Sequence, residues 1–377
     1  MEKPKMCWVT ADYFADCDFK PEFLKIISKK YTIHWIVVLF HSGNRYQEKD
    51  FDIVRQMDAD INLEIVHISH RHRDIRVFGD YNNLKKRILS NSPDLIYLNI
   101  SVGEVHIVPM VYGLPVNRTI ISAHQGKIHE GMRHKSLCKI FRWMIYRRLL
   151  NVNMFSESQM HFFKETFPKS RVFLNHLGLK EMGTSSVVRN YKEDKVRFLS
   201  FGIINYAKNI DLLIDAAESL YDEGERDFVV SINGGCGNWQ FYADRIKHLE
   251  IFETDIRLIP NDLIPDLFTK SHFFVQPYRV VSQSGPLKIA YAYNTPVIVS
   301  DLPGFTDEVE DGVSGYIFEH NNLESLKSAM RRAIDCYRTG YDKLQDSMRT
   351  YVYEHYSDEK MAEKYIQMFN TVINDEK

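Results

Sequence analysis

The chain lacks the cysteine pattern of a disulfide-stabilised protein or of a zinc-binding module. Its five cysteines are scattered, odd in number and include no C-x-x-C pair. Neither a disulfide framework nor a cysteine-based zinc site is therefore expected, and a reducing compartment suits such thiols. The five are Cys7, Cys17, Cys138, Cys236 and Cys336.

Long apolar runs are also missing. The longest is Ile36–Phe40, which is far too short to cross a bilayer. The first residues, Met1–Lys5, show neither the apolar core nor the cleavage site of a secretory signal, so we expect a cytoplasmic protein. The formal net charge of -2 gives no reason to expect a nucleic-acid partner.

What the chain does have is enough material for two domains. It contains 377 residues, of which 44% are hydrophobic, and this length suits two domains of average size. The first half alternates short apolar runs with polar, periodic segments such as Tyr81–Leu89 and Lys135–Leu150. Runs that are apolar throughout predict strands buried on both faces of a parallel sheet. The predicted strands are Met6–Ala11, Ile33–Phe40, Leu63–Ile68, Asp94–Ile100, Thr119–Ala123 and Val152–Ser156.

A polar segment without periodicity, Lys180–Asp194, is interpreted as an interdomain linker. A second alternating series follows it, and Ser357–Ile373 reads as an amphipathic terminal helix capped by Ser357. The predicted strands of this series are Val196–Phe201, Phe228–Ile232, Ile256–Ile259, His272–Gln276, Val297–Ser300 and Tyr316–Phe318, and the predicted helices are Asn209–Leu220, Trp239–Leu249, Leu287–Tyr293 and Leu323–Cys336. An α/β fold with domains over 1–180 and 181–350 and a terminal segment over 351–377 is expected.

Two strand-to-helix junctions in the second half are candidate ligand sites, because ligands of open α/β sheets collect at the carboxyl ends of strands. In the first, a strand ends at Gly202 and Lys208 stands just before a helix. A phosphate there would meet free backbone N–H groups and an ammonium. The alternative is a solvated lysine in a turn.

In the second junction a buried strand is followed by Gln283, Ser284, Gly285 and Pro286. Ser284 or Gly285 would cap the next helix and Pro286 would occupy its first turn. Gly285 would also let a ligand approach the backbone closely. A purely structural helix start is the alternative.

These segments together resemble one family. Phe201–Lys208, Gln283-Ser284-Gly285, Ala292–Asp301, Gly304 and Glu310–Gly315 recur in this order. The pattern resembles the donor-binding half of the GT4 family of GT-B glycosyltransferases, in its Gln-Ser-Gly form, over roughly residues 196–320.

The resemblance implies two Rossmann-like domains facing each other across a cleft, with the terminal helix returning to the first domain. It implies a retaining glycosyltransferase that uses a UDP- or GDP-sugar, needs no metal, and serves a glycan or lipid-linked acceptor, most commonly in bacterial surface polysaccharide synthesis. Lys208 would neutralise the donor diphosphate beside Gly202, and Gln283, Ser284 and Gly285 would contact it. His124, which follows a strand as in the family's His-Asp loop, would orient the donor sugar, although Gln125 replaces the usual aspartate.

The sequence also departs from the family. Ile203 stands where the family usually has a basic residue, and Val281 and Ile289 occupy the positions of two glutamates. Arg279 and Lys288 could supply the missing cation. The departures leave a catalytically silent GT-B subunit that binds sugar or a partner transferase as the main alternative, and a sugar-nucleotide epimerase of the same architecture as another.

Three further features carry weaker predictions. His67, His70 and His72 lie among arginines without a nearby carboxylate or cysteine at zinc spacing, which favours a solvated basic loop. Residues 133–150 form a basic amphipathic helix that would either lie on the inner face of the membrane or pack on its sheet with a basic outer face; the second is the commoner outcome. Asp12, Asp16 and His129 are acceptor-side candidates.

Overall fold

The computed structural model describes residues 2–11, 21–41, 47–126, 135–189 and 195–375. The chain divides into two compact units. Unit 1 comprises Met1–Gly178 together with Asp358–Lys377, and unit 2 comprises Leu179–Ser357. The chain therefore leaves unit 1, builds unit 2 and returns to unit 1 for its last helix.

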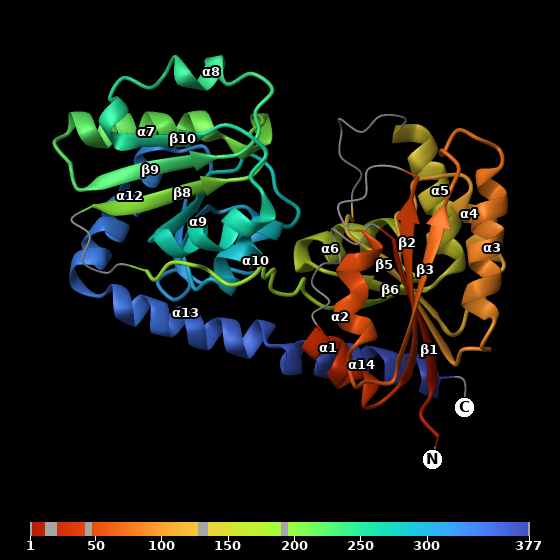
Figure 1. Ribbon diagram of the computed structural model, residues 1–377. Coiled ribbons are helices and arrows are strands. Elements are labelled where there is room, and N and C mark those ends of the chain that lie inside the picture. Colours follow the sequence, from red (N-terminus) through yellow and green to blue (C-terminus); the bar gives the residue numbers. More distant parts are fainter. Residues whose placement is uncertain (1, 12–20, 42–46, 127–134, 190–194, 376–377) are drawn as a thin grey trace. The chain divides into compact units, whose positions relative to one another are not determined.

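Unit 1 is built on a seven-stranded parallel sheet in the order β3-β2-β1-β4-β5-β6-β7. Figure 1 shows strands of this sheet lying side by side. β1, β2, β4 and β5 are buried nearly throughout, as their apolar sequences predict. The strands are β1 Lys5–Ala11, β2 Thr32–Phe40, β3 Ile61–Ile68, β4 Leu95–Asn99, β5 Thr119–Ala123, β6 Asn151–Met154 and β7 Arg171–Leu174.

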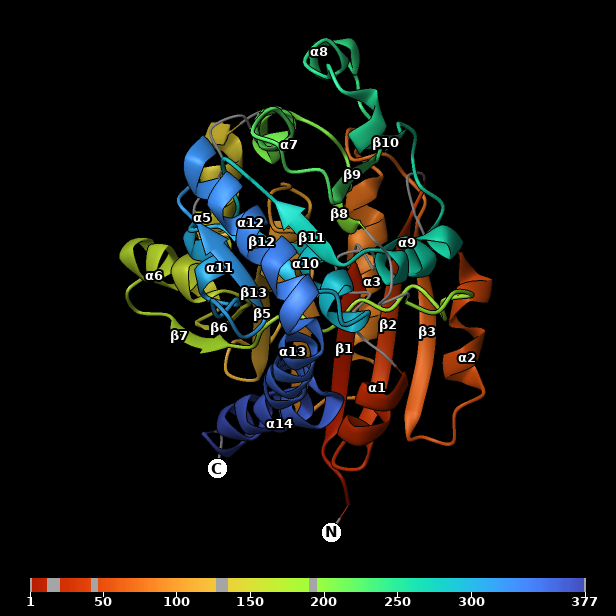
Figure 2. The same cartoon turned by 90° about the vertical axis from the view of Figure 1, so that its left-hand side faces the viewer.

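Helices cover both faces of this sheet, and each face has its own apolar core. One face packs against α1 and α14, which lie next to each other (Figure 2), and the other packs against α3, α4, α5 and α6. The helices are α1 Pro21–Ser28, η1 Glu48–Phe51, α2 Asp52–Arg55, α3 Val77–Leu89, α4 Ile107–Tyr112, α5 Lys135–Arg148, α6 Glu157–Thr166 and α14 Asp358–Asn374.

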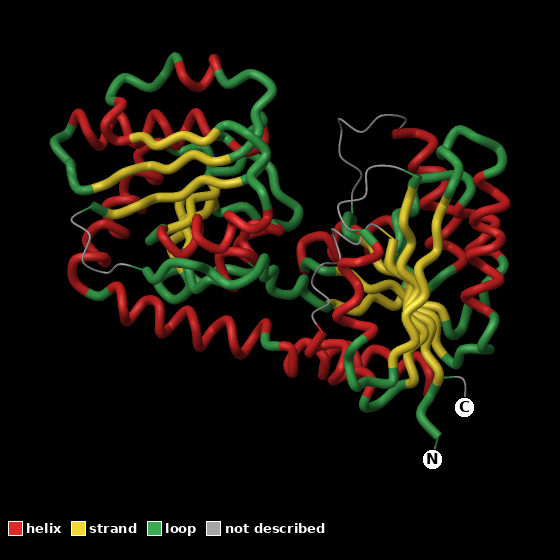
Figure 3. Tube along the Cα trace, viewed as in Figure 1, coloured by secondary structure: helices red, strands yellow, loops and turns green. Residues whose placement is uncertain are grey.

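Unit 2 repeats the arrangement with a six-stranded parallel sheet in the order β10-β9-β8-β11-β12-β13. Its strands lie between two layers of helix (Figure 3). The strands are β8 Val196–Phe201, β9 Phe228–Asn233, β10 Phe252–Asp255, β11 Phe273–Gln276, β12 Val297–Ser300 and β13 Gly315–Phe318.

α7 and α12 cover one face of the second sheet, and α9, α10 and α13 cover the other. α13 belongs to unit 2, so the segment that returns to unit 1 begins at Asp358 rather than at residue 351. The helices are η2 Tyr206–Lys208, α7 Ile210–Asp222, α8 Gln240–Ala243, η3 Leu249–Ile251, η4 Asn261–Leu263, α9 Ile264–Lys270, α10 Gly285–Ala292, α11 Pro303–Thr306, α12 Leu323–Thr339 and α13 Tyr341–Tyr356.

The predicted α/β class is confirmed, and both sheets have the doubly wound order. Successive strands run outward in one direction from β1 and in the other from β4, and the same reversal occurs between β8 and β11. Loops that leave such neighbouring strands diverge and open a crevice for ligands. The fold thus marks one candidate site in each unit.

Two predicted elements of unit 2 are wrong. The strand expected over Ile256–Ile259 is β10, Phe252–Asp255, an edge strand whose side chains are only partly buried. The helix expected over Trp239–Leu249 is reduced to α8, Gln240–Ala243, in which Tyr242 alone is buried. Without a buried apolar face, a longer helix has little to stabilise it.

The segment interpreted as a linker is anchored instead. Arg189 is 8% exposed, and its guanidinium donates hydrogen bonds to Phe268 O, Thr269 O, Tyr293 O, Asn294 O and Thr295 Oγ1. Ser185 and Ser186 bind the carboxylate of Asp266. Residues 180–189 are therefore part of unit 2, and the polar composition that suggested a linker reflects these contacts.

Candidate functional site

The candidate site of unit 2 lies where the loops after β8 and β11 meet, at the reversal of strand order. The Arg279 amide donates to the carbonyl of Ala207 over 2.9 Å, which joins the two loops. The ammonium of Lys208 lies 3.7 Å from the centroid of the Tyr278 ring, a cation–π contact. This is the position that the sequence predicts for a phosphate-binding lysine.

Lys208 ends the turn η2, directly before α7. Asn205 caps that turn by accepting a hydrogen bond from Ala207 N, and Asn209 adopts a left-handed φ of 55° that turns the chain into α7. Within the described parts of the chain, no carboxylate pairs with Lys208. Its half-buried ammonium therefore lies beside the positive end of a helix dipole with its charge uncompensated.

Arg279 differs from Lys208 because its charge is already paired. Its guanidinium binds the Asp211 carboxylate through contacts of 2.6 and 3.2 Å and donates to the carbonyl of Tyr206 over 2.8 Å. Asp211 lies in the first turn of α7. Arg279 thereby fixes the loop after β11 to the start of α7, and its contact with the donor stays a prediction.

Lys288 is withdrawn from the donor contacts. Its side chain is fully buried and forms an ion pair with Glu308, which is 1% exposed. Its ammonium also lies 3.8 Å from the centroid of the Tyr356 ring. Burial raises the pKa of Glu308, although the nearby Lys288 opposes the shift. An ammonium held in this way in the interior has no surface to offer a ligand.

The Gln283-Ser284-Gly285 segment starts α10 as predicted. The Ser284 hydroxyl accepts from Leu287 N over 3.2 Å and from Gln276 Nε2 over 2.6 Å, so it caps the helix. The Gln283 Nε2 atom is buried and, within the described residues, lacks a hydrogen-bond partner. A Cβ added at Gly285 would lie 3.4 Å from Lys180 Nζ. An amide donor, a helix start and a second lysine thus meet at this loop.

Gly202 ends β8 with a φ of 117°, a conformation that favours glycine. A Cβ added at Gly234 would lie only 1.8 Å from the carbonyl oxygen of Gly202. The loops after β8 and β9 are therefore pressed together backbone to backbone. Gly304 likewise allows a close backbone contact with the loop after β11, since a Cβ added at Gly304 would lie 2.9 Å from Val281 O.

The candidate site of unit 1 is a cavity of about 390 Å³ at the ends of β1, β4 and β5. His124 lies in its wall, stacked on Phe155 at 4.5 Å between ring centroids. His124 Nε2 is 3.1 Å from Asn99 Oδ1, and because that oxygen only accepts, Nε2 carries the proton. The lining residues are Ala11, Asn99–Gly103, Ser122–Gln125, Cys138, Arg142 and Tyr146.

Arg142 and Gln159, which the sequence did not single out for this pocket, hold the loop that follows His124. Arg142, from the basic helix α5, donates to the carbonyl of Gln125 over 2.6 Å. Gly126 donates its N–H to Gln159 Oε1 over 3.0 Å. Three other candidates of this unit, Asp12, Asp16 and His129, lie outside the described residues.

The histidines of the predicted basic loop all have carboxylate neighbours that are distant in sequence. His67 pairs with Glu48 at 2.7 Å and His70 with Asp80 at 3.0 Å. His72 lies 3.4 Å from Glu104, beside the buried His106. Burial, together with His72, lowers the pKa of His106 to about 4, so this imidazole is neutral at neutral pH.

α5 departs from the expected basic outer face. Leu137, Ile140 and Trp143 are each about half exposed, and they recur at the spacing of one helix face. Arg147 lies over the Trp143 ring at 4.6 Å. The outer face is therefore mixed, with large apolar side chains among its cations.

Comparison with known proteins agrees with this architecture. Residues 184–355 match the family model described as Glycosyl transferases group 1. A glycogen synthase from Thermodesulfovibrio yellowstonii is 25% identical over 178 residues, which cover 46% of this chain and 35% of that protein. The chain thus spans about a third of the length of this curated relative.

Solved glycosyltransferases share the whole fold. A glycosyltransferase from Rickettsia africae superimposes with a TM-score of 0.73 at 13% identity, covering 100% of both chains. The Anabaena protein Alr3699/HepE, solved in complex with UDP and glucose, has a TM-score of 0.69 at 12% identity, with 98% of this chain and 100% of that one covered. The chain therefore has the GT-B fold, and residues 184–355 of its second unit resemble the glycosyl transferases group 1 family.

Proposed function

We propose that this chain is a retaining glycosyltransferase that moves a sugar from a UDP- or GDP-sugar to a saccharide or lipid-linked acceptor in bacterial surface polysaccharide synthesis. The observation that supports this most directly is Lys208. It stands at the reversal of strand order of a group 1 domain, before a helix N-terminus and without a carboxylate partner in the described chain.

In such a reaction the bond between sugar and diphosphate breaks, and negative charge builds on the leaving diphosphate. The Lys208 ammonium and the N–H groups that open α7 would stabilise this charge, because donors fixed in advance need no reorganisation during the reaction. The amide of Gln283 and the start of α10 would bind the remaining phosphate oxygens. No step of this scheme requires a metal.

In unit 1, His124 would orient the donor sugar rather than act as a general base. Its Nε2–H is directed at Asn99, and its ring stacks on Phe155, so the imidazole is held in one orientation. Retention would follow from attack by the acceptor hydroxyl on the face from which the diphosphate leaves. The HepE complex named above, with UDP and glucose bound to a protein of the same fold, supports this class of donor.

The first experiment is a thermal-stabilisation screen of the purified chain with UDP, GDP and a panel of their sugars. Stabilisation by one nucleotide, and more by one of its sugars, would identify the donor because ligand bound to the native state raises the melting temperature. Products formed from that donor would then be analysed for anomeric configuration. An inverted product would contradict retention.

The role of Lys208 is tested by Lys208→Ala. We expect turnover to fall by about two to three orders of magnitude, as for loss of one charge-stabilising donor, with the melting temperature unchanged because the side chain is only half buried. Lys343→Ala, at an exposed lysine of α13, is the matched control. Near-normal turnover of the Lys208 variant would remove this residue from the site.

Contact with a membrane is proposed through the outer face of α5, which suits a lipid-linked acceptor. None of the helices in the described ranges is long and apolar enough to cross a bilayer, so the contact would be peripheral. We expect the chain to co-sediment with vesicles containing phosphatidylglycerol, and Trp143→Ser to weaken this about tenfold. Ile53→Ser, at an apolar side chain 60% exposed on α2, should have no effect; equal binding by both variants would contradict the proposal.

The alternative, a catalytically silent subunit, is favoured by one observation. Arg279 and Lys288, which could have replaced the missing family cation, are both committed to internal carboxylates. A silent subunit would show no transfer or hydrolysis with any nucleotide sugar, with or without candidate acceptors. A chain stabilised by a nucleotide sugar and turning it over would exclude this alternative.

A further inference from the structure

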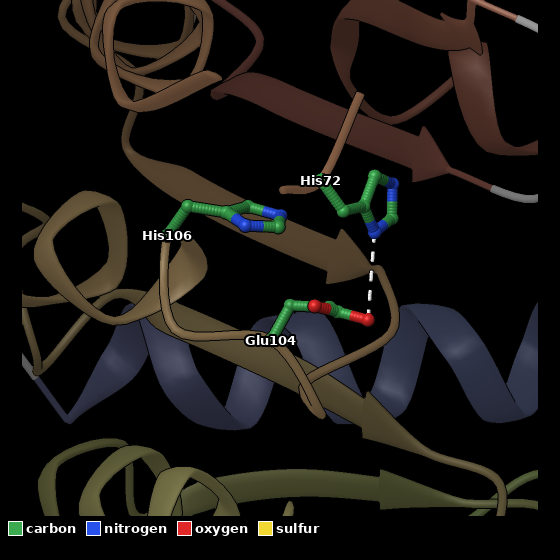
Figure 4. Close-up of side chains that lie close together, drawn as sticks. All are labelled: His72, Glu104 and His106. Atoms are coloured by element: carbon green, nitrogen blue, oxygen red, sulfur yellow. Dashed lines mark ion pairs between the residues drawn. The ribbon is translucent and has the colours of Figure 1, made fainter. Parts of the chain in front are cut away.

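His72, Glu104 and His106 converge at the carboxyl edge of the sheet in unit 1. His72 comes from the loop after β3, and Glu104 and His106 come from the loop between β4 and α4. Figure 4 shows the three side chains turned toward a common space. One ligand atom from each lies within 4.8 Å of the others.

We propose that these three residues form a binding site for a divalent transition-metal ion of the zinc class. Two imidazoles and one carboxylate are a donor set that Zn²⁺ favours, and three protein ligands leave one coordination position open. The sequence offers no such signal, because the ligands are 32 and 34 residues apart along the chain from His72. The site is separate from the diphosphate site proposed in unit 2 and does not depend on it.

His106 provides the strongest argument. Its side chain is fully buried, and neither ring nitrogen has a hydrogen-bond partner within the described residues. Buried polar groups are nearly always paired, so a buried imidazole with two unpaired nitrogens calls for a ligand. Tyr81 packs on its ring at 4.5 Å between centroids, which fixes the imidazole in place.

The other two ligands are free to adjust. The side chains of His72 and Glu104 are 44% and 46% exposed, so both can rotate and an ion can reach them from solvent. Ligand atoms around tetrahedral zinc are about 3.4 Å apart, given metal–nitrogen bonds of about 2.1 Å. The present 3.4 Å between His72 Nδ1 and Glu104 Oε1 already meets this separation, and only His106 has to be approached more closely.

The surroundings suit metal binding rather than a simple ion pair. The His72 ring also lies 5.7 Å from Phe40 and 5.0 Å from His106 between centroids, so the Phe40 ring covers one side of His72. By contrast, the neighbouring pairs His67–Glu48 and His70–Asp80 lack a third ligand among the described residues. Only the His72 pair faces a buried imidazole there.

The metal would join the loop after β3 to the start of α4. Gly103, next to Glu104, lines the cavity that contains His124. The open coordination position would hold water or an oxygen atom of a bound molecule. The site would therefore stabilise the β4–α4 loop, one wall of that cavity, independently of the transfer reaction.

The test measures Zn²⁺ binding by the chelator-treated full chain, by calorimetry and by the visible spectrum of the Co²⁺-substituted protein. We expect one high-affinity ion per chain, a tetrahedral cobalt spectrum, and thermal stabilisation by Zn²⁺ but not Mg²⁺. His72→Ala and Glu104→Gln should each weaken binding at least about tenfold. His106→Phe, which fills the buried space without a ligand, should abolish the cobalt spectrum.

The matched controls are His67→Ala and Glu48→Gln, which remove an exposed His–Glu pair of the same region. Both should bind Zn²⁺ like the unmodified chain. Absence of one-to-one binding, or equal binding by the His72, His106 and His67 variants, would overturn the proposal. The readout is metal binding, which is measured independently of sugar transfer. Zinc binding by an inactive chain would support this proposal and not the transferase, and activity without zinc binding would do the reverse.

Discussion

At the scale of single residues, Gly126 sets how closely the loop after β5 approaches α6. A Cβ added there would lie 2.1 Å from Gln159 O and 2.9 Å from Phe163 N. These are backbone atoms of a helix and cannot move aside as a side chain would. The loop that carries His124 therefore depends on a glycine at its end.

We predict that Gly126→Ala destabilises unit 1 by about 1–3 kcal/mol, the usual penalty of overpacking, and lowers sugar transfer by displacing His124. The urea midpoint and turnover would be measured together. Gly79→Ala is the control, since its added Cβ meets nothing within 4 Å on helix α3. Alanine should be neutral or stabilising by up to about 1 kcal/mol there. If both variants had the same stability, the close contact at Gly126 would be unimportant.

Residue roles could be predicted from sequence where they follow from local geometry. Ser284 as a helix cap and Lys208 before a helix both depend on a strand-to-helix junction, which is visible in the order of residues. The partners of Arg279 and Lys288 could not be predicted, because Asp211 and Glu308 are 68 and 20 residues away. The same holds for His106, whose burial beside His72 is set by tertiary packing.

At the scale of elements, the ion pair between Lys288 and Glu308 links α10 to the segment after α11. The carbonyl of Glu308 also accepts hydrogen bonds from Tyr291 and Tyr351, over 2.6 and 3.1 Å. The Glu308 carboxylate itself is buried and forms an ion pair with the buried Lys288 ammonium. Removal of one partner leaves the other buried and unpaired.

We predict that Lys288→Met destabilises the chain by about 3–5 kcal/mol at pH 8 and by less at pH 5. Burial already raises the pKa of Glu308, and loss of the ammonium raises it further. A carboxyl with a raised folded pKa loses stability as pH rises, so at pH 5 the protonated form limits the penalty. Denaturant unfolding at both pH values is the measurement.

The double variant Lys288→Met/Glu308→Leu provides the control for this pair. It should recover most of the stability, since an apolar pair of similar volume can replace a buried ion pair, and its stability relative to the unmodified chain should vary less with pH. A single variant that is equally unstable at pH 5 and pH 8 would show that packing rather than charge is responsible.

Most strands were predictable from their apolar residues, and these include the edge strands β3 and β13. β5, β8 and β12 coincide with the predicted ranges, because most of their residues are apolar and buried. β7 and β10 are edge strands of four residues without a fully buried side chain; no strand is predicted at β7, and β10 lies four residues before its predicted range. The segment with Arg189 is ordered although its sequence is polar. Hydrogen bonds fix it in place, and such bonds produce no periodic pattern of apolar residues that a sequence could reveal.

At the scale of the whole molecule, the chain ends in the unit where it began. α14 packs on the sheet of unit 1, and its Phe369 is fully buried. The Phe369 ring lies 5.7 Å from each of Trp8, Tyr31 and Tyr97 between ring centroids. Unit 1 therefore completes one of its two cores with residues that are synthesised after all of unit 2. The amphipathic pattern predicts the helix and the family resemblance its return to the first domain, but its individual ring partners are visible only in the folded chain.

This order of assembly predicts that a substitution at the very end of the sequence affects the beginning. Phe369→Ala should destabilise unit 1 by about 3–5 kcal/mol, as for other buried phenylalanines, and leave unit 2 unaffected. Hydrogen exchange read by mass spectrometry should show lost protection in β1, β2 and β4 and unchanged protection in β8 and β9. Gln367→Ala, at an exposed position of the same helix, should change neither. Equal loss of protection in both units would instead mean that the two sheets unfold as one cooperative body, and that the division of the chain into two units does not extend to its energetics.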